Sequence, residues 1–182
     1  MTITRDTKDW TWVLERRCPE CGFDAGGFPR EEVGRLIREN AASWSDVLAH
    51  PDARRRPSDD VWSALEYACH VRDVFDLYHL RLGLMLEQDD PVYPNWDQDE
   101  AAVEQKYGEQ DPAEVLGQLQ EAAHKLADRF DRVEGNQWDR TGRRSDGKNF
   151  TVESFARYFI HDPTHHLHDT ERGFERLSGS GR

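Results

Sequence analysis

Four segments of the chain place an apolar residue at every third or fourth position, which is the spacing of an amphipathic helix. The stripes are Val33, Ile37, Ala41, Trp44 and Leu48; Trp62, Leu65, Cys69, Phe75, Tyr78, Leu82 and Met85; Val115, Leu119, Ala122, Leu126, Phe130 and Val133; and Val152, Phe155, Phe159, Leu167 and Phe174. Each stripe has to be buried against another helix. The sequence therefore predicts an all-α protein, an antiparallel four-helix bundle with a long connection between the second and third helices.

Capping residues mark the starts of three of these helices. Ser63 and Glu66 have the spacing of a capping box. Asp111 precedes a proline, which is favoured at the first helical position. Thr151 is a good N-cap for the fourth helix. The second helix is expected to end at about Glu87, before a stretch rich in aspartate and proline.

The chain divides into three parts by composition. Residues 1–28 are expected to form an N-terminal segment of extended structure and loop, extended from Trp10 to Glu15. Residues 29–177 are expected to form the bundle, and residues 178–182 a flexible tail. A short helical piece is predicted between Trp96 and Tyr107, and a polar loop from Trp138 to Asn149.

Charge and composition restrict the partners. A net charge of −12 argues against a nucleic-acid binder, which needs many cationic contacts to phosphate. No apolar run is long enough to cross a membrane, and the start of the chain shows no signal-peptide core. We therefore expect a cytoplasmic protein. The resemblance described below implies a small-molecule substrate and is compatible with a homodimer. A basic cluster in the loop before the fourth helix is either a solvated connector or a carboxylate-binding patch: Arg140, Arg143, Arg144 and Lys148.

Two of the three cysteines form a Cys-x-x-Cys pair, Cys18 and Cys21. The pair has three readings: a plain turn, a redox or disulfide pair, or half of a zinc site completed elsewhere in the chain. Cys69 lies in an apolar stripe and is predicted to be a core residue.

Histidines are concentrated near the C-terminal end of the chain. His161 and His165 are four residues apart, so on a helix their imidazoles lie one turn from each other and can bind one metal ion. A third nitrogen must come from a neighbouring helix, and His70 is the candidate. The sequence therefore predicts a divalent metal site formed by His70, His161 and His165, with zinc or nickel as the expected metal.

The pattern Trp62-Ser63-x-x-Glu66-x-x-x-His70, followed by His161-x-x-x-His165, resembles the DinB-like superfamily. That family consists of metal-binding four-helix bundles and includes mycothiol-dependent maleylpyruvate isomerases and bacillithiol transferases. The resemblance implies that His70, His161 and His165 are the ligands. Maleylpyruvate isomerases have a glutamate where this chain has His161, so the chain is more similar to the all-histidine branch.

Two features leave the geometry of the C-terminal pair open. Pro163 lies between the two histidines and either kinks the helix or starts a new one. On an unbroken helix, His161 and His165 lie more than about 100° from the centre of the apolar stripe, toward the edge of the bundle or a cleft. His166 and His168 are expected to be outer or surface residues. Asp169 and Asp73 are either solvated helix carboxylates or residues that hold an imidazole by a hydrogen bond.

Three ligands leave a coordination position open, as in a catalytic site. The resemblance implies a metal-dependent thiol S-transferase that acts on electrophilic small molecules, with a low-molecular-weight thiol such as mycothiol as cofactor. The alternatives are a metal-dependent hydrolase using the same site, or a non-enzymatic, stress-related metal-binding module.

Overall fold

The computed structural model describes residues 9–179. Residues 1–8 and 180–182 lie outside the described part. The predictions for residues 1–8 and for most of the flexible tail, residues 178–182, therefore fall outside it as well. The residues 178 and 179 that it does describe belong to the last helix.

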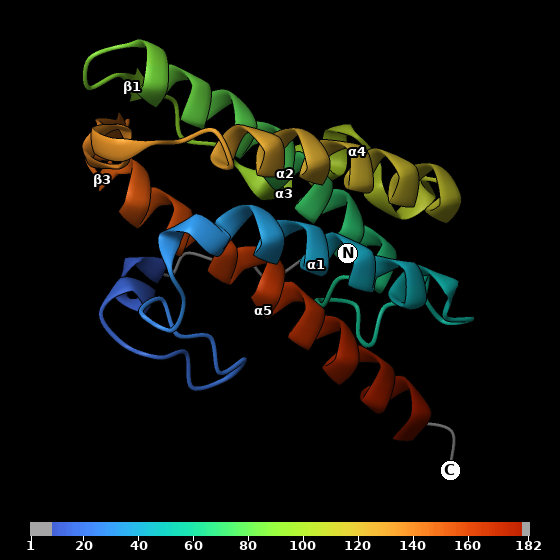
Figure 1. The fold of residues 1–182 in the computed structure, drawn as a ribbon. Coiled ribbons are helices and arrows are strands. Elements are labelled where there is room, and N and C mark those ends of the chain that lie inside the picture. Colours follow the sequence, from blue (N-terminus) through green and yellow to red (C-terminus); the bar gives the residue numbers. More distant parts are fainter. Residues whose placement is uncertain (1–8, 180–182) are drawn as a thin grey trace.

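Four long helices form the body of the molecule, and their bounds are Val33–Ala49 for α1, Ala64–Glu87 for α2, Pro112–Phe130 for α4 and Val152–Gly179 for α5. α1 packs against α4 and α5, and α2 packs against the same two helices, so the order around the bundle is α1, α4, α2, α5. In Figure 1, α1 and α5 run in one direction while α2 and α4 run in the other.

The neighbouring helices α2 and α4 are therefore parallel, which differs from the predicted antiparallel arrangement. Arg72 donates to Gln118 at 2.8 Å, and further along both helices Arg129 donates to the carbonyl of His79 at 3.0 Å. Parallel neighbours require the chain to return across the length of the bundle. The long connection does this, and it contains the predicted short helix, α3 (Gln98–Glu104), and a 3-10 turn, η3 (Tyr107–Glu109).

The predicted helix caps are confirmed. Ser63 caps α2 in a capping box with Glu66, and Asp111 caps α4 with proline in its first turn. The Thr151 hydroxyl accepts the backbone N–H of Ser154 at 3.1 Å at the start of α5. The predicted apolar stripes supply most of the core, whose largest fully buried side chains include Trp44, Phe75, Phe155, Phe159, Leu119 and Leu126.

A small three-stranded sheet was not predicted, and it corrects the all-α assignment. β1 (Val92–Tyr93) pairs in parallel with β2 (Thr141–Arg144), and β2 pairs antiparallel with β3 (Asn149–Thr151). The expected polar loop therefore contains a short hairpin. Gly142 in β2 lies so close to α2 that a Cβ atom there would be 2.7 Å from the Met85 side chain. Such short strands carry almost no alternating pattern, so tertiary contacts decide their formation.

The N-terminal segment, which we define as residues 9–28, contains a 3-10 helix, η1 (Trp10–Leu14), in place of the predicted extended stretch. Asp9 caps this helix by accepting the backbone N–H of Thr11 at 3.0 Å. Another 3-10 turn, η2 (Arg30–Glu32), leads into α1, and η4 (Gly135–Asp139) follows α4. η1 contacts α5, so the N-terminal segment lies against that helix (Figure 1).

α5 continues without a break through Pro163. Proline removes one backbone hydrogen bond from a helix interior. The hydroxyl of Thr164 donates to the carbonyl of Ile160 at 2.7 Å and so adds a hydrogen bond beside the missing one. The continuous helix keeps the one-turn spacing of residues four apart on both sides of the proline.

Among the described residues, no helix combines the length and the apolar character that crossing a bilayer would need.

Candidate functional site

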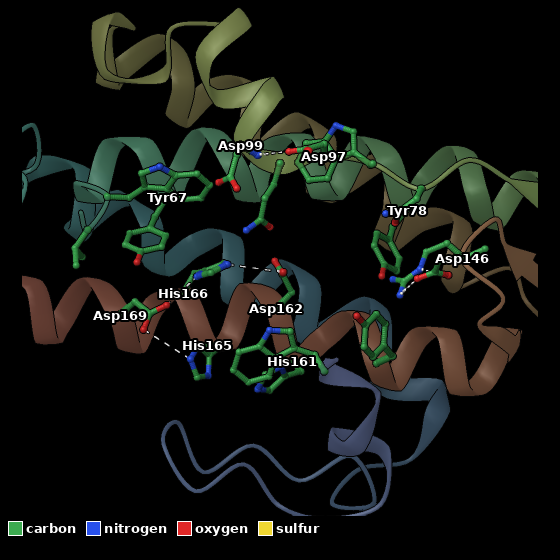
Figure 2. Close-up of a pocket in the computed structure, with 18 of the residues that line it drawn as sticks. Tyr67, Tyr78, Asp97, Asp99, Asp146, His161, Asp162, His165, His166 and Asp169 are labelled. Carbon is green, nitrogen blue, oxygen red and sulfur yellow. Dashed lines mark hydrogen bonds and ion pairs between the residues drawn. The ribbon is translucent and has the colours of Figure 1, made fainter. Parts of the chain in front are cut away.

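α5 lies between α2 on one side and the N-terminal segment on the other (Figure 2). Successive residues of a helix differ in direction by about 100°. His161 and His165 therefore form one stripe, and Asp162 and His166 form the next. In Figure 2 the first pair points toward the N-terminal segment, and the second pair points toward α2.

The second stripe completes a three-residue group with α2, which we call the His70 group: His70, Asp162 and His166. One ligand atom from each residue lies within 4.8 Å of the other two. His70 Nε2 is 3.4 Å from Asp162 Oδ1, and His166 Nε2 is 3.7 Å from Asp162 Oδ2. Two imidazoles and a carboxylate thus converge on one point.

The His70 group contains buried polar atoms without hydrogen bonds. Both ring nitrogens of His70 and Oδ1 of Asp162 are in this state. A buried polar atom without a partner costs about 1–3 kcal/mol. Burial by itself would raise the pKa of Asp162, but the imidazoles of His70 and His166 hold it well below its usual range, so the carboxylate is ionised. The group fits a divalent cation, which would give a partner to one ring nitrogen of His70 and to Oδ1 of Asp162.

Outer contacts hold the imidazoles of the His70 group in place. His166 Nδ1 is 2.9 Å from Asp169 Oδ2, and a hydrogen bond there leaves Nε2 available to a metal. The ring centroid of His70 lies 5.4 Å from that of Trp62 and 5.6 Å from that of Trp96. These aromatic walls restrict the rotation of the His70 ring.

A cavity of about 540 Å³ opens beside the His70 group and is lined by Asp162, His166 and Asp169. Its aromatic lining residues are Trp10, Trp62, Trp96, Tyr67, Tyr78 and Tyr158. Its other carboxylates are Asp60, Asp97, Asp99 and Asp146. Among the described lining residues, the only cation apart from the histidines is Arg144, whose guanidinium lies 2.8 Å from Asp146. The volume suits a small molecule.

The first stripe belongs to a different cluster, the Cys18 group: Cys18, Cys21, His161 and His165. One ligand atom from each of the four lies within 4.8 Å of all the others. Cys18 Sγ is 3.7 Å from His165 Nδ1, and the ring centroids of His161 and His165 are 5.0 Å apart. Cys18, His161 and His165 are buried, and Cys21 is partly buried.

Burial disfavours charge on three members of the Cys18 group: His161, His165 and Cys21. Desolvation lowers the pKa of His161 to about 4, helped by neighbouring His165, and it also lowers that of His165. Desolvation raises the pKa of Cys21 to about 11. Neutral imidazoles are the form that binds metals. A thiol loses its proton once a cation stabilises the thiolate.

The three histidines predicted as one metal site are therefore distributed over two groups. His70 belongs to the His70 group, and His161 and His165 belong to the Cys18 group. No group among the described residues contains all three. The physical reason is the direction of the C-terminal pair: an unbroken α5 turns it away from the apolar stripe that faces α2, and the N-terminal segment covers it.

Other candidate residues have different partners from those expected. Asp73 accepts hydrogen bonds from Tyr107 and Gln105 instead of holding His70. His168 belongs to neither group. Asp162 was not predicted to be a site residue. It lies four residues before His166, the same one-turn spacing that led to the prediction of the His161 and His165 pair. Arg140, one of the four residues of the basic cluster, donates a hydrogen bond to the Met85 carbonyl at 2.7 Å, near the end of α2.

A histidine and carboxylate group between the helices of a bundle is an established way to build a metal site, so the fold and the His70 group match a known class of helical bundle. The chain belongs to the DinB superfamily, whose family model matches residues 35–169. It is similar in structure to YfiT from Bacillus subtilis, described as a probable metal-dependent hydrolase with an unusual four-helix bundle topology. The two share 19% sequence identity with a TM-score of 0.64, and the match covers 96% of this chain and 93% of YfiT. No curated protein is similar enough in sequence to match.

Proposed function

We propose that the protein is a metal-dependent hydrolase whose divalent ion is held by His70, Asp162 and His166. The observation that carries the proposal is the convergence of these side chains beside a cavity of about 540 Å³, with the His70 nitrogens and Asp162 Oδ1 buried and without hydrogen bonds. Three protein ligands leave at least one coordination position for water or substrate. When bound, such an ion acts as a Lewis acid and makes water or a thiol easier to deprotonate.

The residues of the chain hold this centre and shape its cavity. Asp169 orients His166 through Nδ1, and the rings of Trp62 and Trp96 flank His70. The donor set of two imidazoles and one carboxylate accepts zinc, nickel or iron(II). Membership of the DinB superfamily and the fold shared with YfiT support the assignment.

The lining of the cavity restricts the substrate. Its aspartates and aromatic rings favour a neutral or cationic molecule with an apolar or aromatic part over a polyanion. Arg144 is the one lining residue within residues 9–179, apart from the histidines, that carries a positive charge. Its guanidinium is engaged by Asp146 and lies 6.0 Å from the Tyr158 ring centroid. It is placed to bind one acceptor group of a substrate.

Thiol S-transfer is the second candidate function, and one observation favours it. The His70 group contains a carboxylate, Asp162, as the maleylpyruvate isomerases contain a glutamate among their ligands. A small thiol such as mycothiol would then be the cofactor, and an electrophilic small molecule the substrate.

Metal analysis of protein purified without an affinity tag tests the centre. Asp162→Ala and His166→Ala should each lose one equivalent of divalent metal relative to wild type, whereas His124→Ala, an exposed histidine on α4, should lose none. An unchanged metal content in both variants would reject the centre.

Activity then distinguishes the two functions. Wild-type protein is incubated with a panel of aryl esters and amides in the absence of thiol, and separately with small thiols and an electrophilic aryl chloride. Metal-dependent hydrolysis without thiol supports the hydrolase, and metal-dependent thiol consumption supports the transferase. If neither activity responds to removal of the metal, both are rejected in favour of a metal-binding module.

A further inference from the structure

We propose that Cys18, Cys21, His161 and His165 form a second, structural zinc site that fastens the N-terminal segment to α5. It is separate from the His70 group and does not depend on the proposed function. The four residues supply two sulfur and two nitrogen ligands, which is a complete tetrahedral set for zinc and leaves no open position.

The spacing of the ligands within each pair suits a shared cation. Cys18 and Cys21 have two residues between them, and His161 and His165 have three, as in zinc sites with two cysteines and two histidines. Zinc bonds of about 2.0–2.3 Å place tetrahedral ligand atoms about 3.3–3.8 Å apart. The separation of 3.7 Å between Cys18 Sγ and His165 Nδ1 falls within that range.

The turn that carries the cysteines is built to bring their sulfur atoms together. The backbone N–H of Gly22 donates to the Cys18 carbonyl at 3.0 Å, and the N–H of Cys18 donates to the Phe23 carbonyl at 2.8 Å. Gly22 has a φ of +76°, which a residue with a side chain rarely adopts. Arg17 Nε donates to the Gly22 carbonyl at 2.6 Å and closes the turn from outside.

The histidines present the nitrogens that zinc requires. His161 Nε2 is buried and has no hydrogen-bond partner. His165 directs Nδ1 to Cys18, while its Nε2 lies 3.7 Å from Asp169 and 3.8 Å from Glu20. A carboxylate on the far nitrogen is the usual outer contact of a metal-binding histidine. The orphaned nitrogen on one ring and the carboxylates behind the other both point to a cation between them.

A zinc ion here would join two parts of the chain that are far apart in sequence. Cys18 and His165 are separated by 147 positions, and a link that closes so long a loop restricts the unfolded chain strongly. The same link holds Trp10, which lines the cavity and whose ring lies 5.3 Å from the His161 ring and 5.2 Å from the His165 ring. The zinc site therefore also supports one wall of the cavity.

Cobalt(II) substitution tests the site, because only thiolate ligands give an intense sulfur-to-cobalt charge-transfer band. Metal-free, reduced, full-length protein is titrated with cobalt(II). We expect the band, together with the ligand-field bands of tetrahedral cobalt, to appear and to saturate by two equivalents, because the His70 group can bind the second ion. Absence of the band from wild-type protein would overturn the proposal, and that result needs no variant to fold.

Variants then assign the ligands. Cys18→Ala and Cys21→Ala should abolish the band, whereas Cys69→Ala, the buried cysteine of α2, should keep it. The double variant Asp162→Ala, His166→Ala lacks the His70 group and should still show the full band. Failure of the hydrolase proposal therefore leaves this result unaffected. Loss of the band in Cys69→Ala but not in Cys18→Ala would reject the assignment.

Thiol reactivity provides a second measurement on the unmodified chain. Zinc should slow alkylation of Cys18 and Cys21 at least tenfold, and a chelator should restore the rate. A rate that does not respond to zinc, or a Cys18–Cys21 disulfide in zinc-free protein isolated under reducing conditions, would overturn the site in favour of a redox pair.

Discussion

The imidazoles of His165 and His166 belong to adjacent residues, yet their ring planes are inclined at 82° and their centroids lie 6.3 Å apart. One ring faces the N-terminal segment and the other faces α2 (Figure 2). A single helical step of about 100° therefore separates two candidate metal sites with different ligands. Removal of a ligand from one site should therefore leave the other site intact.

His165→Ala and His166→Ala are predicted to remove different metals. His166→Ala should lose the metal of the His70 group and keep the cobalt–thiolate band, whereas His165→Ala should weaken or lose that band and keep the metal of the His70 group. Metal content and the cobalt spectrum measure the two outcomes. Equal effects of the two variants on both readouts would mean that one shared site exists in place of two.

Asp169→Asn is predicted to weaken metal binding without removing a ligand. Asp169 lies 2.9 Å from His166 Nδ1 and 3.7 Å from His165 Nε2, so it supports both groups. Loss of an outer carboxylate typically lowers metal affinity roughly 10–100-fold. We expect the larger loss at the His70 group, because the contact there is shorter. Competition with a chromophoric chelator measures both affinities, and Glu171→Gln, an exposed acidic residue of the same helix, is the control. Unchanged affinities would show that Asp169 has no positioning role.

Zinc is predicted to raise the thermal stability and to protect the N-terminal segment. A ligand present at about 100 times its dissociation constant stabilises the folded state by about 2.7 kcal/mol, which corresponds to a rise in Tm of roughly 5–10 °C for a chain of this size. A chelator should reverse the shift and increase proteolytic cleavage between residues 10 and 28. Cys18→Ala serves as the matched control, since its remaining response to zinc reports the His70 group alone. A cleavage rate independent of zinc would contradict the fastening role.

Glu66→Gln is predicted to destabilise the protein at neutral pH by about 2 kcal/mol, the scale of lost hydrogen bonds to a buried charge. The Glu66 carboxylate accepts from the backbone N–H and the hydroxyl of Ser63, both at 2.8 Å, and pairs with Arg56. It closes the first turn of α2, one turn before His70. Urea unfolding of both proteins measures the difference.

The stability difference between wild type and Glu66→Gln is predicted to depend on pH. Burial alone would raise the pKa of Glu66, but Arg56 and Ser63 lower it below 4.5 in the folded protein. A carboxylate with a lowered pKa stabilises the fold fully above its unfolded pKa, and this contribution is lost as the pH falls through the folded value. The stability difference between wild type and Glu66→Gln should therefore shrink on acidification below about pH 4.5. A difference that stays constant down to pH 3 would contradict the assigned role of the charge.

The sequence predicted the helices well because their signals are local. The spacing of apolar residues predicted the buried stripes of the four long helices. The capping residues Ser63, Asp111 and Thr151 predicted where three of these helices begin. The long connection was also recognised, because its prolines interrupt a helix. The direction of α4 relative to α2 and the small sheet were not predicted, since both depend on contacts between distant segments.

The chemistry of the sites was determined only in part by the sequence. The Cys-x-x-Cys turn, His70 and the histidine-rich stretch of α5 all identify metal-binding residue types, and the phase of His161 already indicated a direction away from the core. Which of these residues lie together was decided by the tertiary structure. A continuous α5 turns each residue about 100° from the next, and packing of the N-terminal segment on one side of the helix and α2 on the other assigns the two stripes to different partners.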